Sequence, residues 1–323
     1  MNRVFLAGYY RTPMVKMAIS RSEQVLATQK CLLRTLAESR LGMTDKIDRI
    51  YSLGPNKFKH KDFGLSKSIV TESCQDRRAF GLNWVKAGIE RIQNSLADII
   101  LYTGNSRRLQ RKHLFHYEKE WADDSIQKTI KGNHANIFLE RIVPVVANDY
   151  HYVIKDELTQ WTKGRVRVFA AASFALVSEK AIKDFGIVPI AELYNVSLDP
   201  NSAYADALKK SLSKINPRMP LGALRVFETD CHWHSLRELI EELKIPKEYI
   251  NRFGNELAFG DPGDRVADFV KIGRVLDILK REKNDYGAVI VLGDTNANDE
   301  ILAAACLTLR RIHFWNEDTK AAL

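Results

Sequence analysis

One cysteine in this sequence has neighbours that favour nucleophilic chemistry. Cys74 is followed closely by Arg77 and Arg78. Positive charge near a thiol lowers its pKa and favours the thiolate, which is the nucleophilic form. The alternative is a cysteine at a strand end with no chemical role, because free cysteine packs like a small apolar residue.

A second group of reactive side chains lies in the segment Cys231-His-Trp-His. The imidazole of His232 or His234 could act as a base near neutral pH. The same side chains together with Cys231 could bind a metal ion, but adjacent ligands without a distant partner form a weak metal pattern. We therefore expect no metal site here.

Asp261 stands in the segment Gly-Asp-Pro, which ends at Pro262. A carboxyl group has a reference pKa of about 3.9, so it is a base near neutral pH only if its pKa rises strongly. Asp before Pro is also a good start signal for a helix. The sequence favours a helix cap at Asp261, with a catalytic acid or base as the alternative.

Composition places the chain among ordinary globular proteins. Of its 323 residues, 45% are hydrophobic and 28% are charged, as in soluble domains. No apolar run is long enough to cross a membrane, and the first residues are a poor match to a secretory signal. The four cysteines show neither metal spacing nor a disulfide pattern, which indicates a reducing cytoplasm.

The net charge of +9 is concentrated in two basic clusters, at residues 57–61 and 107–113. Such clusters could bind nucleic acid or the phosphates of coenzyme A. No nucleic-acid motif accompanies them, so we expect a solvated basic surface and no nucleic-acid partner. A binder of nucleic acid or of another anionic partner remains an alternative.

Strands and helices alternate in the first half of the sequence. Apolar runs predict strands at Val4–Ala7, Arg49–Leu53, Ser68–Glu72, Ala97–Thr103 and Val168–Val177. A helix begins at the capping box of Ser20 and Glu23, and its predicted apolar face holds Val25, Leu26, Leu32, Leu33 and Leu36. A long helix at Gln75–Asn94 has Leu82, Val85, Ile89 and Ile92 on one face.

The second half repeats this alternation. Strands are predicted at Val188–Val196, Ala223–Glu228, Glu256–Phe259, Ala288–Leu292 and Ile301–Leu309. Helices are predicted at Tyr204–Ser213, Ser235–Leu243 and Arg265–Lys280, the last with Val266, Phe269, Val270, Val275 and Leu276 among its apolar residues. Two similar halves around a charged segment predict a layered α/β fold with two central sheets.

Several segments, in order, resemble the thiolase superfamily. Arg11-Thr-Pro follows the first strand, as it does in thiolases, and residues 172–186 are similar to the motif D-G-A-A-A-x-x-L-x-S-E-x-x-A-x-x-x-G of that superfamily. Residues 228–232, Glu-Thr-Asp-Cys-His, are similar to the Glu-His-Asp-Cys-Phe of sterol-carrier-type thiolases. Residues 251–262 are similar to the catalytic loop that ends in Gly-His-Pro, with Asp261 in place of the histidine. Thiolase-type β-ketoacyl synthases share the fold and are the nearest alternative relatives.

The resemblance implies a five-layer α/β/α/β/α fold with two pseudo-repeated halves. It divides the chain into an N-terminal half (1–104 and 166–187), a shortened loop-domain insertion (105–165) and a C-terminal half (188–323). It also implies a dimer, formed with a second copy or with a thiolase-fold paralogue. Its ligand would be a coenzyme A thioester, with no covalently bound cofactor.

The resemblance also indicates which catalytic groups have changed. Cys74 is nearest to the nucleophile position, but it precedes Asp98 by 24 residues, about a helical turn more than in thiolases. Asp261 replaces the histidine and Leu292 replaces the second cysteine. Asp230 matches the aspartate of the Glu-His-Asp-Cys-Phe segment in sterol-carrier-type thiolases. His232 could substitute for the histidine base that Asp261 replaces.

These changes support two hypotheses about function. In the first, the protein has lost thiolytic and Claisen chemistry and acts as an acyl-thioester-binding or scaffolding subunit, paired with an active paralogue. In the second, it is an active acyl-CoA acyltransferase that makes or breaks carbon–carbon bonds, with Cys74 as nucleophile and His232 or His234 as base.

Overall fold

The computed structural model describes residues 2–12, 15–16, 21–41, 46–53, 69–74, 81–109, 167–200, 221–229, 241, 243–250, 264–292 and 303–312. The strands are β1 (Val4–Arg11), β2 (Val15–Lys16), β3 (Arg49–Leu53), β4 (Val70–Cys74), β5 (Ile99–Leu109), β6 (Arg167–Ser178), β7 (Pro189–Pro200), β8 (Leu224–Thr229), β9 (Tyr286–Leu292) and β10 (Ala303–Arg311). The helices are α1 (Arg21–Glu38), α2 (Gly81–Gln93), α6 (Glu179–Phe185) and α9 (Asp264–Glu282), with 3-10 turns η4 (Leu221–Ala223) and η5 (Lys247–Tyr249).

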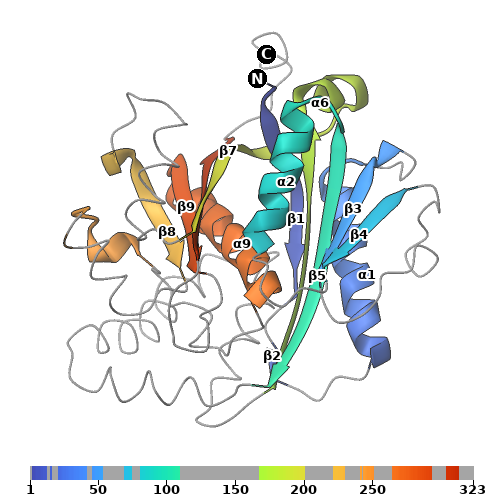
Figure 1. Ribbon diagram of the computed structural model, residues 1–323, viewed down its shortest axis with the longest axis horizontal. Coiled ribbons are helices and arrows are strands. Elements are labelled where there is room, and N and C mark those ends of the chain that lie inside the picture. The colour runs from blue at the N-terminus through green and yellow to red at the C-terminus, as the bar shows by residue number, and fades with distance from the viewer. Residues whose placement is uncertain are drawn as a thin grey trace.

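The strands form a sheet in the order β4-β3-β5-β6-β1-β7-β10-β9-β8, with β2 beside β6 (Figure 1). One pairing scheme occurs twice in it. Strand β6 runs antiparallel to β1 and β5, and β5 runs parallel to β3. Likewise β10 runs antiparallel to β7 and β9, and β9 runs parallel to β8. Two related halves would produce this repetition, while the five-layer arrangement stays a prediction.

Strand β1 joins the two sets of strands. It pairs with β6 on one side and with β7 on the other, where Val4 lies opposite Leu193. The two sheets expected from the sequence are therefore hydrogen-bonded into one, and the prediction of separate sheets is wrong. The apolar pattern of a strand does not tell whether it has one neighbour or two.

Helices cover both faces of the first set of strands. On one face Phe5, Leu101 and Val177 pack with residues of α1 and α6. On the other face Tyr102 and Leu176 pack with residues of α2 and α9. The near-continuous apolar run of β5 is thus buried on both sides, as predicted for a strand covered on both faces.

Helices α2 and α9 contact each other and strands of both sets (Figure 1). The predicted apolar face of α2 is confirmed, because Leu82, Val85, Ile89 and Ile92 are all buried. In α9, buried residues continue around the whole helix from Val266 to Leu276. An apolar surface on all sides is typical of a helix inside a protein. No helix in the described ranges is long and apolar enough to cross a membrane.

Strand β5 is longer than the sequence predicted. It continues to Leu109, and residues 105–109 pair with β6 from Ala171 to Arg167. These five residues therefore belong to the sheet, and their assignment to the insertion is wrong. The charged residues Arg107 and Arg108 interrupt the apolar pattern by which the strand was recognised. The rest of the insertion, the predicted helix at 204–213 and the predicted strand at 256–259 lie outside the described residues.

The apolar face predicted for α1 is partly wrong. Leu32 and Leu36 are buried, but Leu26 and Leu33 are 64% and 59% exposed. The face toward the sheet instead holds polar residues, among them Gln24, Thr28, Thr35 and, just past the helix, Ser39. These polar side chains can be buried because strands β5 and β6 supply hydrogen-bond partners. Asn105 Nδ2 donates to Thr28 Oγ1 at 2.8 Å, and Thr35 Oγ1 donates to the Ser173 carbonyl at 2.9 Å.

Helix α6 was not among the predicted helices, although its capping residues mark both ends. The hydroxyl of Ser178 accepts a hydrogen bond from the Ala181 amide, which is N-cap geometry, and Gly186 ends the helix with a φ of 64°. A Ser-to-Gly span of this length is the signal that could have found the helix.

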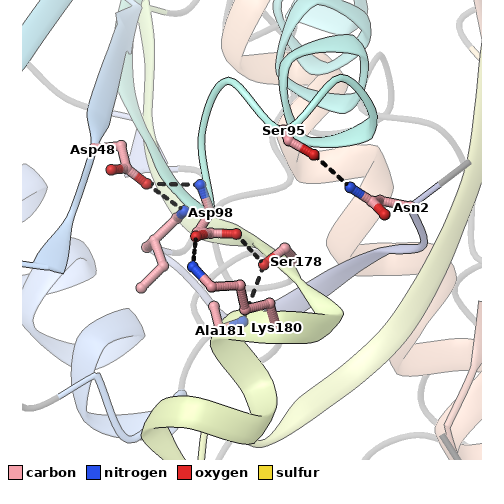
Figure 2. Close-up of polar contacts among 8 residues, drawn as sticks. Asn2, Asp48, Ser95, Asp98, Ser178, Lys180 and Ala181 are labelled. Carbon is pink, nitrogen blue, oxygen red and sulfur yellow. Dashed lines mark hydrogen bonds and ion pairs between the residues drawn. The ribbon is translucent and has the colours of Figure 1, made fainter.

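Two aspartates hold the start of β5, Asp48 from the segment before β3 and Asp98 through contacts with the start of α6 (Figure 2). Asp48 Oδ2 accepts the amides of Asp98 and Ile99 at 2.7 and 2.8 Å. The Asp98 carboxylate accepts Ser178 Oγ at 2.6 Å and Lys180 Nζ at 2.7 Å. Burial raises the pKa of Asp98, but the hydrogen bonds from Lys180 and Ser178 outweigh it, so the pKa is lowered overall.

We expect Asp98→Asn to reduce the acid sensitivity of the fold. A carboxyl whose pKa is lower in the folded state stabilises the fold above its unfolded pKa, and this stabilisation is lost as the pH falls through the folded pKa. The wild type should therefore lose stability below about pH 4 by a larger amount than the variant. Urea unfolding at pH 7 and pH 3 measures the difference. Asp184→Asn on α6 is the matched control, and an equal effect of both substitutions would contradict the prediction.

Candidate functional site

The carboxyl ends of the parallel strands β3 and β4 lie next to each other, beside the middle of β5. Leu53, the last residue of β3, is in register with Cys74 of β4 and with Gly104 of β5. A Cβ atom at Gly104 would lie 3.0 Å from Cγ2 of Val266, so β5 passes directly against the first turn of α9. Ligands of sheets built from parallel strands and connecting helices bind at this end. The candidate site therefore lies between these strand ends and the starts of α2 and α9.

The starts of α2 and α9 are tied together by a buried hydrogen bond. The backbone amide of Leu82 donates to Oδ2 of Asp268 at 3.1 Å. Amides in the first turn of a helix have no acceptor within the helix, and the helix dipole makes this end favourable for an anion. Asp268 is 1% exposed. The anion at the start of α2 is thus supplied by the chain itself, from the facing helix.

Further buried charges follow along α9. Lys271 Nζ lies 3.8 Å from Oδ1 of Asp268, and Arg274 lies 3.6 Å from Oε2 of Glu228 on β8. All four side chains are less than a tenth exposed. Charges buried to this extent are stabilised by opposite charges nearby. Two anions and two cations give a set without net charge.

Aromatic rings fill the interior beside these charges. Tyr102 stacks on Phe174 with ring centroids 4.7 Å apart, and Phe269 of α9 meets both rings edge-on. The Tyr102 hydroxyl donates to the Trp84 carbonyl at 2.8 Å, and burial raises its pKa well above the ordinary value. A phenol held in this way is protonated near neutral pH and serves packing. The interior beside the buried charges is therefore packed with aromatic rings.

Of the four predicted catalytic residues, the structure describes only one, Cys74, and only its backbone. Cys74 ends β4 beside Leu53, at the end of the sheet described above, and the first residue of α2, Gly81, comes seven residues later. The side chain of Cys74 lies outside the described part of the chain. Its predicted role stays a prediction.

Asp230, His232 and Asp261 also lie outside the described residues, as do Cys231 and His234. Two of the described elements adjoin them in the sequence. Asp230 directly follows β8, and Asp261 precedes the first residue of α9 by three positions. Their roles, including the helix cap proposed for Asp261, are untested by this geometry.

Thr229 and Leu292 stand where the resemblance places a polar side chain and a cysteine. Thr229 is fully buried and pairs with Ile290 of β9, and Leu292 is the last residue of β9, in register with Ala304 of β10. Both positions therefore belong to the ends of neighbouring strands. Glu228, one residue before Thr229, is part of the buried charge set.

Three buried charged residues of α9 were not predicted from the sequence: Asp268, Lys271 and Arg274. A charged residue on a predicted helix is by default assigned to a solvated face. The signal that could have found them is the distribution of apolar residues over all sides of α9, which leaves no solvated face for charges at 268, 271 and 274. Charged residues inside such a helix require partners.

The fold has a counterpart among solved structures. A crystal structure of the acetyl-CoA acetyltransferase of Bacillus anthracis is similar to this chain, with a TM-score of 0.70 and 12% identity over 97% of this chain and 99% of that one. The chain gives no match to models of protein families or to curated protein sequences. At this identity the likeness establishes the fold, and the predicted thiolase-like α/β fold is confirmed.

Proposed function

We propose that this protein keeps a thiolase-like fold without thiolytic or Claisen chemistry. It serves as an acyl-thioester-binding or scaffolding subunit that pairs with an active thiolase-fold paralogue or with a second copy. The ligand it would bind is a coenzyme A thioester, and its location would be the cytoplasm. Strand β4 is one of the two edge strands of the described sheet, with Val70 48% exposed, and a strand edge can offer backbone groups to a partner subunit.

The observation that carries this proposal is the Asp268 carboxylate at the start of α2. Thiolase chemistry needs a thiolate at a helix start, where free amides and the dipole lower the thiol pKa. Here the Leu82 amide is bound to a buried carboxylate. Because this amide already donates to an anion, it gives less stabilisation to a thiolate at the same place, and a thiol there is less reactive.

The loss of matching side chains supports the same conclusion. Asp261 stands in place of a histidine base, and Leu292 in place of a second cysteine. A carboxylate next to a developing oxyanion has the wrong sign of charge to stabilise it. A leucine cannot move a proton at all. These two changes, together with the Asp268 carboxylate at the start of α2, favour a binding role over a modified reaction.

We expect no covalent acyl adduct and no turnover. The full chain is incubated with acetyl-CoA and with acetoacetyl-CoA plus coenzyme A, then analysed by intact mass and by loss of acetoacetyl-CoA. Calorimetry with the same thioesters measures binding. The expected result is binding without an adduct, and turnover equal to that of a sample without protein.

Two cysteine variants make the test specific. An adduct or turnover that disappears in Cys74→Ala and persists in Cys231→Ala would overturn the proposal in favour of an active acyltransferase. If neither an adduct nor thioester binding is observed, the proposed role is limited to scaffolding. That case is then examined by sedimentation with a catalytic paralogue.

A further inference from the structure

The exposed side of α1 carries an apolar stripe that the fold itself does not use. Leu26 and Leu33 are 64% and 59% exposed and lie two helical turns apart on the same side of the helix. Ala37 is also exposed and continues the stripe, and the exposed Lys30 lies between the leucines. Their spacing, four, three and four residues, is that of a seam that packs against another helix.

The opposite side of α1 shows that this arrangement is not an accident of a weakly packed helix. Cys31 and Thr35 are fully buried against the sheet, where Cys31 Sγ donates to the Ala171 carbonyl at 3.5 Å and Thr35 Oγ1 donates to the Ser173 carbonyl at 2.9 Å. These hydrogen bonds fix the orientation of the helix. It buries Thr35 and Cys31 together with Leu32 and Leu36, which leaves Leu26 and Leu33 as apolar surface that its own core does not cover.

The charge next to the stripe indicates what can cover it. Lys30 and Arg34 are both exposed beside the leucines, and the acidic residues of the helix, Glu23 and Glu38, lie near its two ends. A partner with acidic side chains beside an apolar seam would match both features. A second copy of this chain fits poorly. In an antiparallel pairing of α1 with its symmetry mate, Lys30 is midway between the leucines and would face the mate's own Lys30.

We propose that the face of α1 formed by Leu26, Lys30, Leu33 and Ala37 is a docking surface for an amphipathic helix of a partner protein, whose apolar seam is flanked by acidic residues. The surface lies on the opposite face of the sheet from α2 and α9. Docking there would leave the candidate site open to its own ligand. The proposal does not depend on whether that site performs chemistry.

The test uses the full chain and a labelled synthetic peptide of about 28 residues, with leucine at the a and d positions of each heptad and glutamate at e and g. Fluorescence anisotropy should show saturable binding that weakens at high salt. The double variant Leu26→Gln, Leu33→Gln should bind at least about tenfold more weakly. Leu96→Gln is the matched control, because Leu96 is 65% exposed elsewhere on the surface, and it should bind as the wild type does.

A charge-reversal variant tests whether the basic residues beside the leucines select an acidic partner. The double variant Lys30→Glu, Arg34→Glu should lose at least about tenfold in affinity for the acidic peptide and gain affinity for a version with lysine at e and g. Circular dichroism and thermal unfolding should match the wild type in all variants, since every substituted side chain is exposed. This check separates loss of docking from loss of folding.

Three outcomes would overturn the proposal. One is equal peptide affinity in the wild type and the Leu26→Gln, Leu33→Gln variant, or no binding by either. Another is a wild-type dimer that dissociates in that variant, which would make the face a self-contact. The third is leucine-dependent binding to vesicles of anionic phospholipid without peptide binding, which would make it a membrane-binding face.

Discussion

Asp268→Ala is expected to lower the free energy of unfolding by about 3 kcal/mol, because removing one member of a buried ion pair leaves the other charge without its counter-ion. The substitution takes away the group 3.8 Å from Lys271 Nζ and the acceptor of the Leu82 amide. Urea denaturation of the full chain, followed by circular dichroism, measures the change. The size of the effect reports how firmly the starts of α2 and α9 are joined.

Two further variants separate charge from hydrogen bonding at this position. Asp268→Asn keeps an oxygen that can accept the Leu82 amide and removes only the charge, so it should destabilise less than alanine. The double variant Asp268→Leu, Lys271→Met replaces the pair with apolar side chains and should recover much of the lost stability, since well-packed apolar residues often replace buried ion pairs at little cost. Recovery would show that the two side chains act as a pair.

A loss below about 1 kcal/mol for Asp268→Ala would contradict this account, because that is the size of an exposed ion pair. It would mean that water reaches the starts of both helices. The same result would weaken the functional proposal, since an accessible helix start could still stabilise a thiolate. The stability of this one variant therefore bears on the function as well as on the fold.

Periodicity predicted the helices in the centre of the molecule well and the helix on its outer face poorly. Leu82, Val85, Ile89 and Ile92 repeat at helical spacing, and packing buries all of them. The same reasoning applied to α1 selected Leu26 and Leu33, which are exposed. Hydrophobicity ranks leucine above threonine, but it does not register that strand β6 offers carbonyl groups to Thr35.

The position of Cys74 in the fold was predictable from the sequence, while its role stays a prediction. Strand-helix alternation predicts that Cys74 lies between a strand and the long helix, and the structure places it at the end of β4, before α2. Asp268 could not be assigned in the same way. Its role depends on α9 facing α2 across a long sequence separation, and no local pattern encodes which helices are neighbours.

Gly8→Ala should be about as damaging as the loss of Asp268, with an expected destabilisation of about 3 kcal/mol. Gly8 lies at the irregularity of β1 between Ala7 and Tyr9 and has a φ of 64°, which costs a residue with a side chain about 1 kcal/mol. A Cβ atom there would also lie 2.4 Å from the Thr35 carbonyl oxygen of α1. Backbone cannot rotate away as a side chain can, so the helix must move off the sheet, which adds about 2 kcal/mol.

Gly186→Ala is the control that isolates the backbone strain. Gly186 has the same φ of 64° at the end of α6, but nothing lies within 4 Å of the position of its Cβ atom. It should therefore cost only about 1 kcal/mol, and the difference between the two variants measures how tightly α1 is held against β1. That contact fixes the orientation of α1, because Thr35 also donates its hydroxyl to the Ser173 carbonyl. Equal effects of the two substitutions in urea unfolding would show that α1 can move away freely, and the outward position of Leu26 and Leu33 would then lack its structural cause.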